Sequence, residues 1–164
     1  MNIFIENPAD QTLVTVKNWK KSKKPFEAKY VILMVSDTEG IRISKNECAA
    51  EHKFKEAQAA AAEVLAPDGQ SMRCPTRKEC LDIYDARFQG LDEAIKIIGG
   101  QELKLNNDYI WTNESDTNPL TRDRFAYSFD AVSGEMYVEH IDYMRTTRPV
   151  SNYQSSPDNT EQGS

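Results

Sequence analysis

Hydrophobic and polar residues follow one another along this chain in two patterns, one typical of strands and one typical of helices. Short runs rich in β-branched residues predict strands at 3–5 and 12–16, and the continuous apolar run at 30–35 predicts a central strand. The sequence after residue 100 is rich in turns and aromatic residues, and it predicts further strands at 109–111, 125–129, 136–138 and 145–150.

Helix starts are marked twice by a Ser or Thr that is followed three residues later by Glu. Ser44 with Glu47 and Thr76 with Glu79 both fit this capping box, in which the two residues satisfy each other's free backbone N–H groups. Apolar residues at helical spacing follow each box. The sequence therefore predicts helices over 44–66, from residue 76 onward, and over 91–98.

The order of these elements predicts the fold class. Strands come first, two or three helices follow, and a loop-rich antiparallel β half ends the chain, which is an α+β pattern. We expect an N-terminal β segment at 1–45, packed on a domain at 46–150. Residues 151–164 offer few apolar side chains to bury and are expected to form a disordered tail.

Composition narrows the classes of function. The chain has 164 residues and 39% hydrophobic residues, which suit a single domain. Its formal net charge of −6 disfavours nucleic-acid binding, and no apolar run reaches the roughly 18 residues of a membrane span. The N-terminus lacks the pattern of a secretory signal, so a cytoplasmic or virion-associated location is expected over Sec secretion.

Three cysteines, Cys48, Cys74 and Cys80, are an odd number without metal-type spacing. Free buried thiols are the favoured interpretation, although the spacing would also suit a Cys74–Cys80 disulfide.

Residues 17–24 hold five lysines around Trp19. A basic stretch with an aromatic residue can hold single-stranded nucleic acid. The acidic chain as a whole favours the alternative, a solvated hairpin tip with Trp19 folded onto the body.

Four short segments, in order, match the boxes of one family. The first matches Trp-Arg-Leu-Pro-Thr-x-x-Glu-Leu, and the others match a Tyr-Trp-Ser/Thr strand, an aromatic hairpin and a closing Arg-Pro-Val. In this chain they are Met72 to Cys80, Ile110-Trp111-Thr112, Tyr127-Ser128-Phe129 with Ser133-Gly134, and Arg148-Pro149-Val150.

Over roughly residues 50–150 the chain resembles the Lcl-type domain, which is named after the C-terminal part of a bacterial collagen-like adhesin. This family is a bacterial and phage branch of the C-type-lectin-like fold. Met72 replaces the tryptophan of the first box, and Cys74 and Cys80 replace its leucines, so apolar character is kept in a divergent member.

The resemblance implies a compact scaffold whose long, variable loop region binds a ligand. Relatives occur in adhesins, pilus tips and phage receptor-binding proteins, so the expected function is non-enzymatic recognition of a glycan or a protein surface. The alternative is a structural or assembly component of a phage virion or a bacterial surface complex. Such a component would self-associate as a homo-oligomer or copurify with a partner, with residues 17–24 as a docking element.

The loop at 106–124 is the candidate binding surface. Tyrosine and asparagine side chains give adaptable contacts at a modest cost in ordering, as in antibody loops. The alternative is that these polar residues only solvate a long loop. The expected ligand-binding residues are Asn107, Tyr109, Asn113, Glu114, Asp116, Asn118, Arg122 and Arg124.

No metal, cofactor or catalytic residue is expected. The oxygen-bearing side chains of this loop are of the type that calcium takes, but acidic loops are common in an acidic protein. The chain lacks the Glu-Pro-Asn or Gln-Pro-Asp and Trp-Asn-Asp motifs of calcium-dependent lectins, and also a phosphate loop, His-Glu-x-x-His and a nucleophile elbow. The fold family includes formylglycine-generating oxidases with two active cysteines, but Cys74 and Cys80 are better explained as core substitutions in the first box.

Five further residues are given structural roles. Trp111 is expected in the core, and Arg73 and Arg148 are expected to tie loops together. His52 is expected on the polar side of the long helix and His140 at the end of a strand. Neither histidine has a recognisable triad partner nearby in the sequence.

Overall fold

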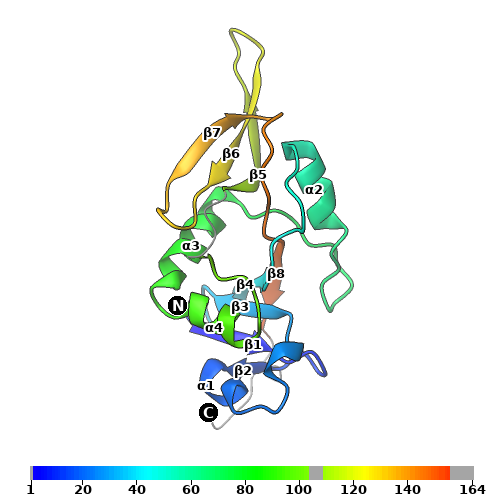
Figure 1. Cartoon of the computed structure of the whole chain (residues 1–164), viewed down its shortest axis with the longest axis vertical. Coiled ribbons are helices and arrows are strands. Elements are labelled where there is room, and N and C mark those ends of the chain that lie inside the picture. The colour runs from blue at the N-terminus through cyan, green and yellow to red at the C-terminus, as the bar shows by residue number, and fades with distance from the viewer. Residues whose placement is uncertain (1, 104–108, 156–164) are drawn as a thin grey trace.

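Two antiparallel sheets and four α-helices form the described part of the chain (Figure 1). This computed structural model describes residues 2–103 and 109–155. The strands are β1 (Asn2–Glu6), β2 (Leu13–Thr15), β3 (Tyr30–Met34), β4 (Glu39–Ser44), β5 (Ile110–Thr117), β6 (Arg124–Phe129), β7 (Met136–His140) and β8 (Val150–Gln154). The helices are α1 (Val16–Lys20), α2 (Phe54–Ala62), α3 (Arg77–Arg87) and α4 (Leu91–Ile97), with a 3-10 turn at Pro25–Glu27.

The expected α+β class with antiparallel sheets is confirmed. A five-stranded sheet has the strand order β2-β1-β3-β4-β8, and a three-stranded sheet has the order β5-β6-β7. The described residues contain four α-helices, whereas two or three were expected. None of these helices has both the length and the apolar character that a membrane crossing requires.

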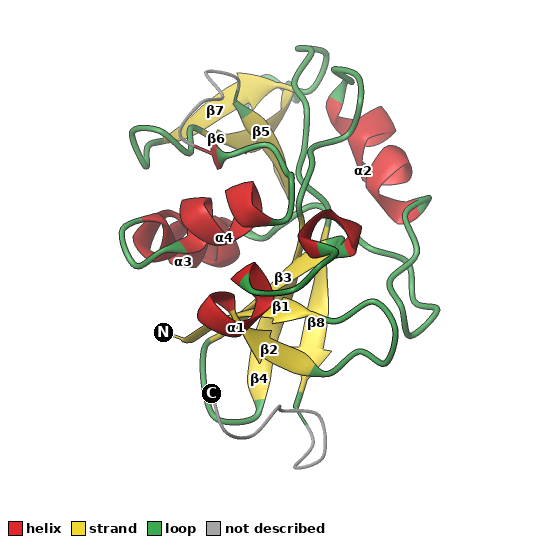
Figure 2. Ribbon diagram, turned by 60° about the horizontal axis from the view of Figure 1, so that its bottom comes forward, coloured by secondary structure: helices red, strands yellow, loops and turns green. Residues whose placement is uncertain are grey.

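The main core lies on the face of the five-stranded sheet that carries the helices (Figure 2). Val31, Leu33 and Ile41 of the sheet and Ile83 and Ile95 of the helices are all buried there. Helix α4 packs on β1 and β3, whereas α3 packs on β5 and β6 of the smaller sheet. The two helices therefore join the sheets.

A second core fixes the smaller sheet to helix α2. It contains Phe54, Ala57 and Ala61 of the helix, together with Trp111 of β5 and Ala126 of β6. Trp111 is fully buried, as the sequence predicts, and its ring meets that of Phe54 edge to face with centroids 5.5 Å apart. Alanines on one helical face allow this close approach to the sheet.

Helix α3 begins where the sequence predicts. The Thr76 hydroxyl accepts a hydrogen bond from the backbone N–H of Glu79 at 3.0 Å, and the Glu79 carboxylate accepts one from the Thr76 N–H at 2.8 Å. Both halves of the capping box are therefore formed.

The long helix predicted over 44–66 is wrong, because only α2 forms within that range. Ser44 ends β4, where it pairs with Tyr30, and its N–H donates to the Pro149 carbonyl at 3.0 Å. Strand pairing thus overrides a local helix signal. His52 consequently lies outside any helix, in a bridge with Arg145, while His140 does end a strand.

The disordered tail predicted from residue 151 is wrong for residues 151–154, which belong to β8. This strand pairs with β4, and both Ser151 and Tyr153 are buried. The Tyr153 ring packs with Ile32 and Met34, so the segment buries an aromatic side chain against the sheet. The last strand therefore begins at Val150 and not at Arg145, and residues 156–164 lie outside the described residues.

Residues 17–24 begin in helix α1 and do not form the expected hairpin tip. Thr15 caps this helix by accepting a hydrogen bond from the Asn18 N–H at 3.2 Å. Trp19 is buried, as expected, and its indole N–H donates to the Pro25 carbonyl at 2.9 Å. The lysines therefore surround a residue that is itself inaccessible.

Candidate recognition surface

The segment predicted as a long loop is mostly a β-hairpin, formed by β5 and β6, that projects beyond the rest of the molecule (Figure 1). At its root the Trp111 indole N–H donates to the His52 carbonyl at 2.8 Å. The register shifts between Trp111 and Ser115, and within this bulge the Asn113 N–H donates to the Pro75 carbonyl at 2.9 Å. The hairpin is therefore anchored to the loop that leads into α3.

The tip of the hairpin, residues 118–123, is a closed turn. The Asn118 side-chain oxygen accepts hydrogen bonds from the N–H groups of Leu120 and Thr121 at 2.9 and 3.4 Å. Arg122 takes a left-handed backbone conformation (φ 63°), and its N–H donates to the Asn118 carbonyl at 2.8 Å. The turn is thus held by its own polar groups, as Asn-initiated turns are.

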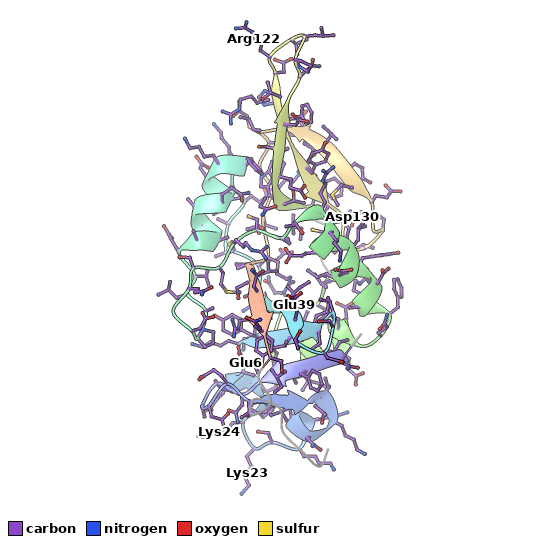
Figure 3. All side chains as sticks on the ribbon, turned by 180° about the vertical axis from the view of Figure 1, so that it is seen from behind. Glu6, Lys23, Lys24, Glu39, Arg122 and Asp130 are labelled. Carbon is purple, nitrogen blue, oxygen red and sulfur yellow. The ribbon has the colours of Figure 1, made fainter. Side chains whose placement is uncertain are left out.

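Leu120 is the most exposed large apolar side chain at this tip, with 92% of its surface accessible. Arg122, beside it in the turn, lies at the opposite end of the molecule from Lys23 and Lys24 (Figure 3). Arg124 is the first residue of β6 and is also exposed. The tip therefore presents one apolar side chain followed by two arginines, far from the lysine-rich end.

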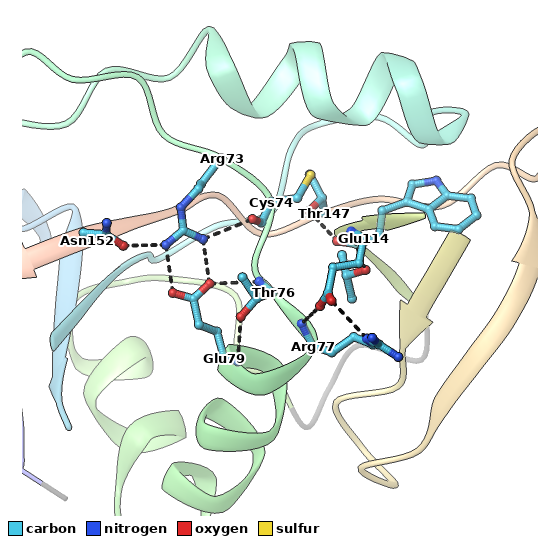
Figure 4. Close-up of polar contacts among 10 residues, drawn as sticks. Arg73, Cys74, Thr76, Arg77, Glu79, Glu114, Thr147 and Asn152 are labelled. Atoms are coloured by element: carbon cyan, nitrogen blue, oxygen red, sulfur yellow. Dashed lines mark hydrogen bonds and ion pairs between the residues drawn. The ribbon is translucent and has the colours of Figure 1, made fainter. Parts of the chain in front are cut away.

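Glu114 attaches the hairpin to the first turn of α3 (Figure 4). Its carboxylate accepts a hydrogen bond from the Arg77 backbone N–H at 2.6 Å and forms an ion pair with the Arg77 guanidinium at 3.2 Å. That guanidinium also lies 4.0 Å from the centre of the Tyr127 ring on β6. A carboxylate is favourable at a helix N-terminus, so Glu114 has a structural partner here.

A second carboxylate, that of Glu79, ties α3 to the five-stranded sheet (Figure 4). The Arg73 guanidinium donates to both oxygens of Glu79 at 2.6 and 2.8 Å and to the Asn152 side chain at 2.6 Å. Burial raises the pKa of Glu79, but the hydrogen bonds from Arg73 and Thr76 outweigh this and leave that pKa below its ordinary value. Arg73 therefore ties segments together, as expected.

Arg148 also ties loops together, but from inside the core. Its fully buried guanidinium donates to the carbonyls of Ser44, Lys45 and Gln101 at 2.7 to 3.1 Å. Burial lowers the pKa of Arg148 to about 10, which still leaves the group charged at neutral pH. The expected structural role of Arg148 is therefore confirmed.

Tyr109 belongs to an aromatic group at the other side of the hairpin root. Its ring stacks on that of Tyr137 with centroids 4.6 Å apart, and the Arg145 guanidinium lies 5.1 Å from its centre. Arg145 in turn donates to both oxygens of Glu139 at 2.9 and 2.6 Å. Burial raises the pKa of Glu139, but hydrogen bonds from Arg145 and Ser128 hold it below its ordinary value.

The structure does not gather the predicted ligand-binding residues into one pocket. Tyr109 lies at the root, Asn113 and Glu114 lie beside α3, and Asp116 is exposed along β5. Only Asn118, Arg122 and Arg124 lie at or next to the tip. Asn107 lies outside the described residues.

Three features of this surface were not predicted from the sequence. Leu120 is an apolar residue within a polar segment, and that contrast is visible in the sequence. The Arg77 to Tyr127 and Tyr109 to Tyr137 contacts join separate segments, so no local pattern points to them.

Three oxygen-bearing side chains of the hairpin have partners within the protein. Glu114 is bound to Arg77, Asp116 accepts from the Thr117 N–H at 2.7 Å, and Asn118 closes the turn. Among residues 2–103 and 109–155, no group of three or more His, Cys, Asp or Glu side chains is placed to hold a metal ion.

All three cysteines are free, as the sequence predicts, but Cys48 is half-buried and not buried as expected. Cys74 and Cys80 are fully buried, and burial raises the pKa of the Cys74 thiol to about 12 and that of Cys80 well above its ordinary value. Since the thiolate is the reactive form, both are poor nucleophiles at neutral pH.

A surface hollow of about 550 Å³ lies away from the hairpin, against the five-stranded sheet. Its floor contains Arg42 of β4 and Glu6 of β1, which are both buried and joined by two hydrogen bonds of 2.8 Å. Because these two charges already neutralise each other, neither is free to bind a ligand. The hollow is therefore a weaker candidate binding site than the exposed hairpin.

Comparison with protein-family models and with curated proteins finds no match. A solved structure titled "Crystal structure of botrocetin" is similar over 77% of this chain and 97% of that one, with 9% identity and a TM-score of 0.41. The strand order and pairing described above define the architecture of this chain.

Proposed function

We propose that this chain is a non-enzymatic recognition module that binds a protein surface through the tip of the β5–β6 hairpin. The observation that carries the proposal is the Leu120 side chain, 92% accessible at the end of a projecting hairpin. Burying a leucine side chain contributes roughly 1.5 to 3 kcal/mol. A convex tip with one apolar side chain suits a groove on a partner protein.

The arginines that follow Leu120 strengthen this proposal. Arginine is enriched among the residues that dominate interface energies, and Arg122 and Arg124 lie two and four residues after the leucine. The hydrogen bonds of Asn118 hold the turn before any partner arrives. A preordered turn lowers the entropy cost of association.

A glycan is the second candidate ligand, favoured by the aromatic group at the hairpin root. The Tyr143 side chain is exposed there, close to Arg145. Tyr109 and Tyr137 already stack on each other, so less of their ring surface is free for a sugar. The resemblance to the Lcl-type domain, within the C-type-lectin-like fold, is consistent with either ligand class.

The non-enzymatic part of the proposal is supported by the thiols. An oxidase that used Cys74 and Cys80 would need at least one accessible thiolate, whereas both groups are buried with raised pKa values.

The alternative of a virion or surface-complex component remains a proposal of its own. Its suggested docking element at 17–24 has exposed lysines, but Trp19 is buried and would not contribute to an interface. The hairpin tip is therefore the better-supported contact surface.

The test is a paired screen of the whole chain against an array of cell-surface proteins and an array of glycans. Leu120→Asp is compared with Leu65→Asp, which alters another exposed leucine away from the hairpin. We expect protein hits that Leu120→Asp loses and Leu65→Asp keeps. Protein hits that survive Leu120→Asp overturn the tip proposal, and glycan hits that depend on Tyr143 transfer the function to the aromatic group.

A further inference from the structure

The sheets of this molecule differ in how their edge strands are protected. Exposed edge strands offer unpaired backbone groups to other chains, so natural proteins shorten, cover, bend or charge them. Strand β2 has three residues and continues directly into α1. Strand β8 begins with two hydrogen bonds of 2.8 Å between Val150 and Arg73, and on β5 the Trp111 N–H donates to the Thr146 carbonyl at 2.8 Å.

Strand β7 has little of this protection within the described part of the chain, because its one carboxylate, Glu139, is held by Arg145. It pairs with β6 alone, its five residues show no bulge, and Met136–His140 contains neither Lys nor Pro. Val138, at its centre, is 59% exposed. Among the described residues, the open edge of the smaller sheet is therefore free of bulges, uncovered and apolar at its midpoint.

The free backbone groups of β7 follow from its register. The Glu135 carbonyl accepts a hydrogen bond from the Asp130 N–H at 3.0 Å. The Ile141 N–H donates to the Arg124 carbonyl at 3.5 Å, so the backbone groups of both residues point toward β6. Since bonding direction alternates along an antiparallel strand, the N–H and C=O groups of Met136, Val138 and His140 point away from β6.

One of these outward groups has an intramolecular partner. The His140 carbonyl accepts a hydrogen bond from the Tyr143 N–H at 3.0 Å in the following turn. A carbonyl oxygen has a second lone pair, so it can accept another bond. The outward N–H and C=O groups of Met136, Val138 and His140 can therefore still bond to another strand, with Val138 at the centre.

We propose that two copies of this chain pair their β7 strands antiparallel about a two-fold axis at Val138. The two three-stranded sheets then join into one sheet of six strands. The occupant of the edge is a second copy because the strand is self-complementary in this register. Val138 faces Val138, Met136 faces His140, and Tyr137 faces Glu139 of the second copy.

Charge selects this register over its neighbours. An axis at Tyr137 would place Glu135 directly opposite Glu139 of the second copy, and an axis at Glu139 would place that carboxylate opposite itself. Like charges at directly opposed positions destabilise a strand pair. The Val138 axis places no carboxylate directly opposite another.

The proposed dimer also orients the recognition surface. Antiparallel pairing of β7 directs the two β5–β6 tips toward opposite ends of the assembly. Dimerisation does not depend on the tip contacting a ligand, so this inference and the proposed function can fail separately.

Light scattering after size-exclusion chromatography over a concentration series tests the dimer. Val138→Lys places two lysines opposite each other and should raise the dimer dissociation constant by about tenfold or more. Val132→Lys is the matched control, because Val132 is an exposed valine in the β6–β7 turn outside the edge. Circular dichroism establishes that both variants are folded. A monomeric wild type, or a dimer that Val138→Lys leaves intact, overturns the proposal.

Disulfide trapping tests the register independently. In a hydrogen-bonded antiparallel pair the Cα atoms are about 5.5 Å apart, which lies within the range of disulfides. Oxidised Val138→Cys should therefore form a covalent dimer, whereas His140→Cys and the wild type should not. Equal trapping of His140→Cys, or no trapping of Val138→Cys, overturns the Val138 axis.

Discussion

The two sheets of this protein are both antiparallel, but they bury their ion pairs to different depths. In the five-stranded sheet, Glu6 and Arg42 are buried and bonded to each other. In the three-stranded sheet, Glu114 and Arg124 lie toward solvent or at the surface contact with α3. The ion pair of the first sheet is therefore fully inside the molecule, whereas the pair of the second sheet, Glu139 with Arg145, is only partly buried.

The same contrast appears along the length of the smaller sheet. Its root is fixed by Trp111, whereas its tip carries the accessible Leu120. Substitutions in the five-stranded sheet or at the root should therefore reduce stability. Substitutions at the tip should alter binding and leave stability almost unchanged, and the following variants test this division.

The largest expected effect comes from removing the anchor at the root. Trp111→Ala leaves a cavity in the second core and removes the hydrogen bond to the His52 carbonyl. Large-to-small changes of a buried aromatic residue cost about 3 to 5 kcal/mol. Urea denaturation should show this loss, and a loss below about 1 kcal/mol, which is typical of surface changes, would contradict a rigid root.

The next effect concerns the buried pair of the larger sheet. Glu6→Gln leaves the Arg42 guanidinium buried without its carboxylate, which costs about 3 kcal/mol, at the lower end for broken buried pairs. The lower end applies because Asp68 remains 3.8 Å from Arg42 and Ser151 still accepts a hydrogen bond.

The double variant Glu6→Leu with Arg42→Met is the matched control. Replacing both partners by apolar residues of similar volume is often neutral, so the double variant should be more stable than Glu6→Gln. A double variant that is the less stable of the two would show that the pair contributes more than mutual neutralisation.

Two identical local signals show what the sequence can and cannot predict. The box at Thr76 and Glu79 starts a helix, because every bond it needs lies within three residues. The box at Ser44 fails, because Ser44 is committed to the ladder with Tyr30 and to the carbonyl of Pro149. A local pattern predicts structure only where no distant strand competes for the same backbone groups.

The same reasoning applies to the candidate surface. Polar composition located the tip residues Asn118 and Arg122, since turn residues are recognisable locally. The same composition predicted Glu114 as a ligand-binding residue, although the Glu114 carboxylate binds Arg77 on another element. Partners brought together by folding decide which polar side chains remain available.

A smaller, pH-dependent effect is expected at the junction between the sheets. Glu79→Gln weakens the hydrogen bonds with Arg73, so it should lower the unfolding free energy by about 1.5 kcal/mol at neutral pH. The native pKa of Glu79 lies below its ordinary value, so its contribution is present above the unfolded pKa and is lost as pH falls through the native one.

Urea denaturation of wild type and Glu79→Gln from neutral to acidic pH measures that dependence. The two stabilities should converge at low pH, where Glu79 is protonated in both states. A difference that stays constant over the whole range would mean that the ionised form has no special role at this junction.

The smallest effect on stability is expected at the tip, where the effect on binding should be largest. Leu120→Asp changes a side chain that is 92% exposed, so the unfolding free energy should stay within about 0.5 kcal/mol of wild type. Asn118→Ala removes the two side-chain hydrogen bonds of the same turn and should cost about 1 kcal/mol. If Leu120→Asp proved the more destabilising of the two, the leucine would serve packing within the chain. The division between a stabilising root and a recognition tip would then fail, because the one apolar side chain at the tip would already have its partner.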